Sequence, residues 1–252
     1  MRTEVEAPGV EPRDVSGGVT VASVGKAFGA VQALDGVSLR ADAREVVAVV
    51  GPSGCGKSTL LELVCGLQEP DSGVIEAPKA ALMPQRDGLL PWLSALDNAA
   101  LGLRVAGVDR AAARAQAHEH FAAFGLEGFE KARPRELSGG MRQRVAYLRT
   151  LLAGRPLLCL DEPFGALDAL TRGQMQRWLA GALQAEPRTV LLVTHDVEEA
   201  VLLADRIVLL SARPGRVIAT LEVPIPRPRH RADDEVVALR ERALATIEGG
   251  DA

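Results

Sequence analysis

Aromatic residues are scarce in this chain, with Phe, Trp and Tyr together filling only 3% of its 252 positions. Hydrophobic residues nevertheless make up 47% of the sequence, so the core must be built mainly from Val, Leu and Ala. Such a core is typical of parallel strands covered by helices on both faces. The length fits one large α/β domain.

Long apolar runs and a secretion signal are also missing. No stretch approaches the roughly 18 apolar residues of a spanning helix, and the first nine residues lack a basic start followed by an apolar block. We therefore expect a cytoplasmic protein, whose association with a membrane would come through a partner.

Cysteines are few, and charge of one sign is not concentrated. Cys55, Cys65 and Cys159 show no Cys-x-x-Cys or Cys/His spacing of a zinc site, so we expect free thiols in a reducing compartment. The net charge is −4 and no dense Lys/Arg stripe occurs. This argues against nucleic acid as the main partner.

Residues 51–59 match the phosphate-cradling pattern G-x-x-x-x-G-K-[ST]. The motif follows an apolar run at 46–50 and precedes a helix-compatible stretch, so it should join a buried strand to a helix N-terminus, where backbone N–H groups face an anion. We expect Lys57 to reach the β- and γ-phosphates of a nucleoside triphosphate and Ser58 to ligate Mg²⁺. The predicted nucleotide-binding loop comprises Gly51, Pro52, Ser53, Gly54, Cys55, Gly56, Lys57, Ser58 and Thr59.

A second motif, Leu-Ser-Gly-Gly-Met-Arg-Gln-Arg at 137–144, precedes an apolar strand that ends in Asp161 and Glu162. In this order the motifs resemble those of ABC-type ATPases. Four further elements fit the same family: Phe28, Gln85, Asp168 in Gly-Ala-Leu-Asp, and His195 after an apolar strand. The resemblance covers residues 19–225.

The resemblance implies an α/β P-loop NTPase fold with a mostly parallel core sheet, an N-terminal antiparallel β subdomain and an inserted helical subdomain at about 89–150. We expect a disordered leader at 1–18, the ATPase domain at 19–225 and a tail with a short helix at 226–252. From the residue patterns, strands are predicted at 19–28, 37–40, 46–50, 80–83, 157–160, 189–194, 206–210 and 217–223. Helices are predicted at 95–103, after Asp109, from 140 to about 152, and at 169–183, 197–204 and 235–247.

The resemblance also assigns roles to individual side chains. Glu162 would polarise the attacking water, and His195 would hold the γ-phosphate and that water in line. Asp161 and Gln85 would join Ser58 at Mg²⁺, and Phe28 would stack on the adenine. Ordinary alternatives are a core phenylalanine at 28, a surface glutamine at 85 and a structural histidine at 195.

The signature motif implies a second copy of the chain. In the family, Ser138, Gly139 and Gly140 contact the ATP held by the phosphate loop of the facing copy in a head-to-tail dimer, and Asp168 belongs to the same nucleotide site. Met141 stands where the commonest form of the motif has Gln, which removes a side-chain amide but leaves the backbone donors.

The implied function is that of the ATP-hydrolysing subunit of a membrane transporter, on the cytoplasmic face of the membrane. Its partners would be two permease subunits and, indirectly, a solute-binding protein. Residues 89–98 resemble the ATPases that serve nitrate, sulfonate, taurine and pyrimidine-precursor importers. Trp92 and Leu93 in this stretch are predicted to dock on the permease, with core packing as the alternative.

Other functions are weighed against the same residues. A soluble ABC ATPase of chromosome maintenance would need long heptad arms between the two motifs, for which there is no room, and the translation kind carries two cassettes per chain. A transporter ATPase for a different substrate, imported or exported, also stays open. A phosphate-loop kinase would not carry the motif at 137–140 or His195.

Cys55 carries one further prediction. It lies near Lys57 and a helix N-terminus, which lower a thiol's pKa, so it should react with a maleimide before Cys65 and Cys159. The alternative is an inert small residue that fits the turn.

Overall fold

The fold was analysed in a computed structural model, which describes residues 17–165 and 167–250. Most of the predicted leader lies outside the described residues. The described chain begins at Gly17, whose carbonyl accepts a 2.7 Å hydrogen bond from the Thr189 hydroxyl. Within the described residues, no helix is both long and apolar enough to cross a membrane.

A six-stranded sheet forms the centre of the molecule, in the order β5-β6-β7-β3-β8-β9. The first five strands are parallel and β9 is antiparallel to β8. Their bounds are β5 (Ala80–Met83), β6 (Leu157–Asp161), β7 (Thr189–Thr194), β3 (Val46–Val50), β8 (Arg206–Leu210) and β9 (Val217–Glu222).

The strand β3 shows why the central strands read as unbroken apolar runs. Val46, Ala48 and Val50 face one hydrophobic core, and Val47 and Val49 face another on the opposite side of the sheet. All five are buried. A parallel strand covered on both faces needs apolar residues at every position, because successive side chains point to opposite faces.

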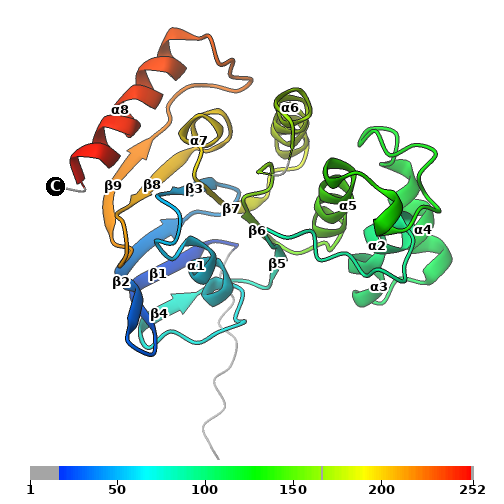
Figure 1. The fold of residues 1–252 in the computed structure, drawn as a ribbon, viewed down its shortest axis with the longest axis horizontal. Helices are drawn as coiled ribbons and strands as arrows, with labels where there is room; N and C mark the ends of the chain where they lie inside the picture. The colour runs from blue at the N-terminus through cyan, green and yellow to red at the C-terminus, as the bar shows by residue number, and fades with distance from the viewer. Residues whose placement is uncertain (1–16, 166, 251–252) are drawn as a thin grey trace, which may run out of the picture.

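Helices cover one face of this sheet, and a helix with a second sheet covers the other (Figure 1). The first face carries α6 (Ala169–Ala185), α7 (Val197–Leu203) and α8 (Asp234–Gly250). The other carries α1 (Lys57–Val64) and an antiparallel sheet of β2 (Val31–Ala41), β1 (Val19–Phe28) and β4 (Ser72–Glu76). The prediction of a mostly parallel core sheet and an antiparallel β layer is therefore confirmed.

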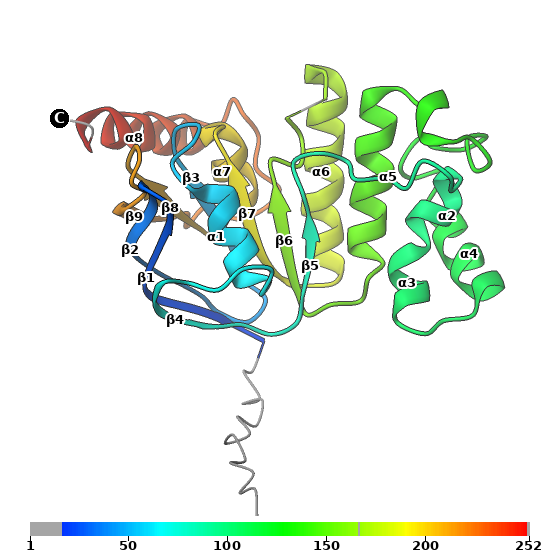
Figure 2. The same cartoon turned by 60° about the horizontal axis from the view of Figure 1, so that its bottom comes forward.

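A group of helices lies beside the central sheet, beyond β5 (Figure 2). It contains α2 (Ala95–Ala99), α3 (Leu101–Val105), α4 (Arg110–Glu119), a 3₁₀ turn (Pro134–Glu136) and α5 (Gly139–Leu151). The single helix predicted at 95–103 is wrong, because the chain turns at Ala100 between α2 and α3. Gly102 then lets α3 approach α5 closely, since a Cβ there would lie 2.9 Å from the Arg149 carbonyl oxygen.

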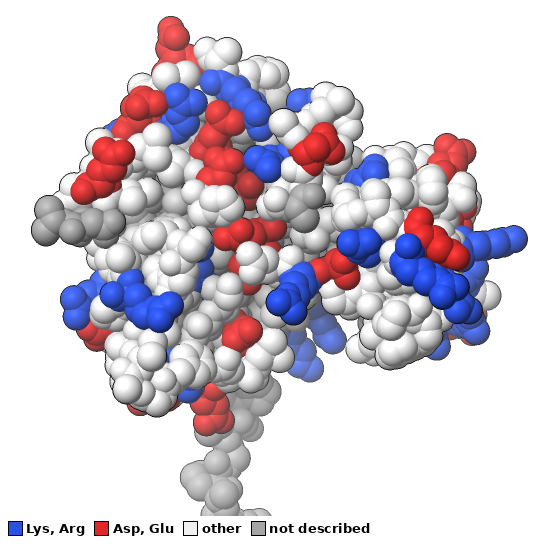
Figure 3. All heavy atoms as spheres, viewed as in Figure 1, with Lys and Arg blue, Asp and Glu red and all other residues white. Residues whose placement is uncertain are grey.

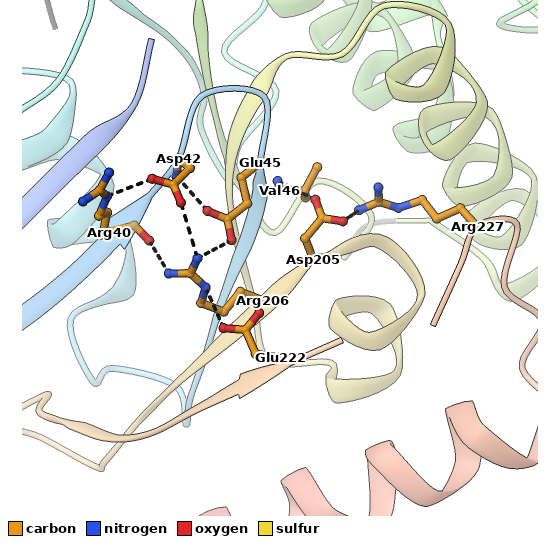
Figure 4. Close-up of polar contacts among 8 residues, drawn as sticks. All are labelled: Arg40, Asp42, Glu45, Val46, Asp205, Arg206, Glu222 and Arg227. Atoms are coloured by element: carbon orange, nitrogen blue, oxygen red, sulfur yellow. Dashed lines mark hydrogen bonds and ion pairs between the residues drawn. The ribbon is translucent and has the colours of Figure 1, made fainter. Parts of the chain in front are cut away.

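Charged side chains are interspersed over the face of the molecule shown in Figure 3. A network of ion pairs lies at the amino ends of β3 and β8 (Figure 4). Arg206 contacts Glu45 at 2.8 Å and Glu222 at 3.2 Å. Asp205 accepts the Val46 N–H at 2.9 Å. These contacts fasten β8 to the turn that leads into β3.

A buried arginine helps to hold the segment between β9 and α8. Arg229 is 9% exposed and donates to the carbonyls of Ile225 (2.7 Å), Val201 (2.7 Å) and Ala204 (2.6 Å). Burial lowers the pKa of Arg229 to about 10, so the guanidinium stays charged at neutral pH. Two of its acceptors belong to the last turn of α7 and its C-terminal cap, where a cation is favourable.

We predict that Arg229→Ala lowers the free energy of unfolding by about 1–3 kcal/mol, because several buried carbonyls lose their donor. Arg242→Ala, at an exposed position of α8, is the matched control and should stay within about 0.5 kcal/mol of the parent. Urea unfolding followed by circular dichroism measures both. Equal midpoints for the two variants would show that Arg229 does not anchor the segment.

Candidate functional site

The strands β3, β6, β7 and β8 run in the same direction, so their carboxyl ends meet at one edge of the sheet. Ligands bind at this edge in open α/β sheets. A cavity of about 420 Å³ opens there. It is lined by Phe28, Val31, Ala33, Ser53, Gly54, Gly56, Lys57, Ser58, Thr59, Gln85, Glu162 and Arg213.

The loop between β3 and α1 curls around the ammonium group of Lys57. This side chain is 5% exposed and donates hydrogen bonds to the carbonyl oxygens of Gly51 (2.8 Å) and Pro52 (2.9 Å). The carbonyls thus turn inward to Lys57. The loop runs directly into the N-terminus of α1, where free backbone N–H groups and the helix dipole favour an anion such as phosphate.

Gly56 is a position where no other residue fits. Its φ is +100°, and a Cβ built there would lie 2.6 Å from Leu34 Cδ2 and 2.7 Å from the Ala33 carbonyl oxygen. The loop therefore packs directly on β2 of the antiparallel sheet, and this contact joins the two layers at the cavity.

Asp161 and Ser58 form the part of the site that suits a divalent cation. Asp161 is buried at the end of β6, and the Ser58 hydroxyl lies close enough to favour the charged form of its carboxylate. Burial raises the pKa of Asp161, because the nearby protein groups do not fully compensate its charge. Hard oxygen ligands at such a point fit Mg²⁺, which would supply the missing positive charge. Gln85 also lines the cavity, and its side-chain amide oxygen is a third candidate ligand for the cation.

Glu162 and His195 are brought together although they follow different strands. The Glu162 carboxylate lies 3.0 Å from His195 Nδ1. Glu162 has φ +46°, which is unusual for a residue other than glycine, and its N–H donates to the Val193 carbonyl at 2.8 Å. A strained backbone held by a neighbouring strand is common where a side chain must be aimed accurately. Here the Glu162 side chain points toward His195 and the cavity.

Phe28 lies at the end of β1 with 47% of its surface exposed, which does not fit the alternative of a core phenylalanine. Its ring faces the cavity together with Val31, and the Lys26 ammonium lies 5.7 Å from the ring centroid. An exposed aromatic face at the rim of a phosphate-loop cavity suits stacking on a flat ring.

The signature motif lies away from this cavity in a single chain. Ser138 is the N-cap of α5, and its Oγ accepts the Met141 N–H at 3.2 Å. Gly139 and Gly140 form the first turn of that helix. None of these three residues lines the cavity that holds Lys57.

Asp168, also predicted at the nucleotide site, serves here as the N-cap of α6. Its carboxylate accepts the N–H groups of Leu170 (3.1 Å) and Thr171 (3.0 Å). Hydrogen bonds from the Thr171 side chain and backbone lower the pKa of Asp168. It does not line the cavity either.

The predicted activation of Cys55 is wrong. The thiol is 1% exposed and packs in the core between the sheets, with Sγ 3.9 Å from Lys57 Nζ. Burial raises the pKa of Cys55 more than Lys57 lowers it. Cys65 is more accessible, and a hydrogen bond with Cys159 lowers its pKa. Cys55 thus corresponds to the alternative of an inert small residue that fits the turn.

Sequence analysis did not predict Arg213, which lies in the turn after β8 and lines the cavity. Its Nε donates to the Gly54 carbonyl at 2.9 Å. The available signal was the Arg-Pro-Gly turn that follows a buried strand, because β8 pairs with β3 in parallel and ends at the same edge. Val31 was missed because the first half of β2 carries little apolar periodicity.

Comparison with known proteins finds relatives of this chain. The chain matches the ABC transporter family over residues 34–165. It is 44% identical to the aliphatic sulfonates import ATP-binding protein SsuB 1 of Rhodococcus jostii, over 90% of this chain and 92% of that protein. It is 46% identical to the taurine import ATP-binding protein TauB of Chromobacterium violaceum, over 85% of this chain and 89% of that protein. The dimeric post-hydrolysis structure of the ATP-binding cassette MJ0796, bound to ADP and Pi, aligns with a TM-score of 0.74 and 29% identity, covering 82% of this chain and all of that one.

We predict that Gly56→Ala abolishes stabilisation by ATP and destabilises the fold by more than the roughly 1 kcal/mol of backbone strain alone. Gly66→Ala is the matched control, because φ there is +68° but a Cβ would meet nothing within 4 Å. Thermal unfolding with and without MgATP measures both effects. An ATP-dependent shift of parental size in Gly56→Ala would contradict the close packing described for this loop.

Proposed function

The chain belongs to the ABC transporter family of ATPases, and on this premise we propose that its ATP hydrolysis drives the import of a small sulfonate, such as taurine or an aliphatic sulfonate. The observation that carries the enzymatic part is the meeting of Lys57, Glu162 and His195 at one edge of the sheet. Relatives at 44% and 46% identity, named for sulfonate and taurine import, support the substrate class.

Nucleotide binding uses the cavity as follows. The adenine stacks on Phe28, and the phosphates lie on the loop before α1. Lys57 exchanges its bonds to the Gly51 and Pro52 carbonyls for bonds to the β- and γ-phosphates. Ser58, Asp161 and Gln85 would hold Mg²⁺, which would supply positive charge to the phosphates.

Hydrolysis uses the pair formed by Glu162 and His195. Glu162 orients the attacking water and accepts its proton, and His195 keeps the terminal phosphate in line with that water. Their 3.0 Å contact already holds the two side chains in mutual register. Catalysis of this kind depends on positioning and charge stabilisation, because phosphoryl transfer passes through a loose transition state.

A second copy of the chain completes the site. The signature residues Ser138, Gly139 and Gly140 lie on the helical side of the molecule, so they reach a nucleotide only across a head-to-tail dimer. Ser138 and the start of α5 then offer backbone donors to the phosphate held by the facing copy. The dimeric cassette with TM-score 0.74 supports this assembly.

The permease docks on the loop that carries Trp92. This side chain is 66% exposed, which fits a contact surface better than core packing. The side chain of the fully buried Asn98 fixes the backbone of this loop. It accepts the Leu90 N–H at 2.8 Å and donates to the Leu90 carbonyl at 3.1 Å. Docking to two permease subunits places the protein on the cytoplasmic face of the membrane, with a solute-binding protein as an indirect partner.

We predict that Glu162→Gln lowers the rate of phosphate release by a factor of roughly 10² to 10⁴ while ATP still binds, because the variant loses the group that orients and deprotonates water.

We predict that Lys57→Ala fails to bind ATP. It should therefore lose the roughly 2.7 kcal/mol of stabilisation that MgATP gives the parent at 100 times its Kd.

Proteoliposomes with the cognate permease and binding protein provide the measurement. Uptake of labelled taurine or an alkanesulfonate should require wild-type Glu162. Uptake of nitrate alone would contradict the substrate class and leave the ATPase assignment standing. Parental hydrolysis by Glu162→Gln would contradict the role of that residue.

We predict that Trp92→Ala weakens binding to the permease by about tenfold or more and leaves stability and ATP binding unchanged, because an exposed aromatic anchor contributes chiefly to the interface. Val105→Ala, which is 72% exposed on α3, is the control for loss of a surface apolar group. Co-purification in detergent compares the two. Equal recovery of the permease with both variants would exclude Trp92 from the interface.

A further inference from the structure

A buried glutamate lies next to the pair that the proposed mechanism uses. Glu199 in α7 is 4% exposed, and its Oε1 has no hydrogen-bond partner among the described residues. A carboxyl group is rarely buried in this way without a partner, because an unsatisfied polar atom costs about 1–3 kcal/mol. The proposed roles of Glu162 and His195 do not use this group.

Glu199 shares a small cavity of about 40 Å³ with both members of that pair. Arg172 of α6, the helix beside α7 in Figure 1, lines the same cavity, and its Nε is likewise buried without a partner among the described residues. One atom is a donor and the other an acceptor. A space of this size holds at least one water molecule, and the walls supply the two to four polar partners that a buried water requires.

The Thr194 side chain lies beside the same carboxyl group and favours its charged form. The Thr194 hydroxyl oxygen accepts the Asp196 N–H at 3.0 Å. Thr194 ends β7, directly before His195. The Glu199 side chain is thus connected to the backbone that positions the histidine.

The charges that face Glu199 come from three directions. Asp196 lies at the start of α7, Arg172 comes from α6, and Glu162 follows β6. Burial, reinforced by the negative charge of Asp196, raises the pKa of Glu199 to about 8. The group is therefore mostly neutral at pH 7, and it ionises as the pH rises through about 8.

We propose that Glu199 is a positioning residue for ATP hydrolysis, which together with Arg172 holds water behind Glu162 and His195 and so keeps the pair aligned. The proposal rests on the proposed roles of Glu162 and His195. A neutral carboxyl offers one donor and one acceptor to this water. Ionisation removes the donor and adds a negative charge close to Glu162, so hydrolysis slows above about pH 8.

The test is the pH dependence of kcat and KM for ATP in the full-length protein, between pH 6.5 and 9.5. Glu199→Gln keeps a donor and an acceptor and cannot ionise. It should stay within about threefold of the parent at pH 7 and keep its rate above pH 8, where the parent declines. Glu199→Leu removes the polar atoms at similar volume, and kcat should fall by roughly tenfold to a hundredfold with KM unchanged, since misplaced groups lose rate rather than binding.

Glu198→Gln is the matched control, because it removes a carboxylate from the same helix that pairs with Arg231 and Arg240 instead of facing the cavity. Its pH profile should follow the parent. The proposal is overturned if Glu199→Gln shows the parental decline above pH 8, or if folded Glu199→Leu keeps the parental kcat. Should Glu199→Leu fail to fold, the Glu199→Gln profile decides alone. Parental hydrolysis by Glu162→Gln would instead overturn the role of Glu162, independently of both Glu199 variants.

Discussion

Parallel pairing of strands that are buried on both faces is the constraint on which the rest of the molecule depends. It requires apolar residues at every position of β3, and it brings the ends of β3, β6, β7 and β8 to one edge. Polar groups cannot lie within these strands without large desolvation costs. The candidate site is therefore built from the last residues of the strands and from the segments that follow them, which come from distant parts of the chain.

The two edges of the sheet have different electrostatic character. At the amino edge, Arg206 and Asp205 pair with surrounding groups and fasten the turn before β3 (Figure 4). At the carboxyl edge, the pKa values of Asp161 and Glu199 are raised because burial is not matched by positive charge. On the proposed function, the cation that accompanies the nucleotide would supply the positive charge that this second edge lacks. Because the two edges are separate, the fold can stay stable while the buried carboxyl groups at the site lack full compensation by positive charge.

Burial and pattern explain which parts of the fold could be predicted from sequence. The bounds of β3, β5, β7 and β8 follow from continuous apolar runs, and the phosphate loop from its fixed residues. The strand β4 was missed because its side chains are mostly exposed and carry no apolar alternation. At the site, Glu162 and His195 were identified by family motifs, but their contact, the role of Arg213 and the burial of Glu199 depend on tertiary packing. The prediction of a lowered pKa for Cys55 failed for the same reason, because the pKa of a thiol depends on how deeply packing buries it.

The hydrogen bonds of Lys57 to its own loop have a consequence for how the free energy of binding is divided. The ammonium group holds the Gly51 and Pro52 carbonyls, so bonds within the chain contribute to the curled shape of the loop. Part of the entropy of fixing those residues is then lost when the chain folds rather than when a ligand binds. On the proposed function, a phosphate that reached Lys57 would exchange with these carbonyl acceptors around a charge that is already in place.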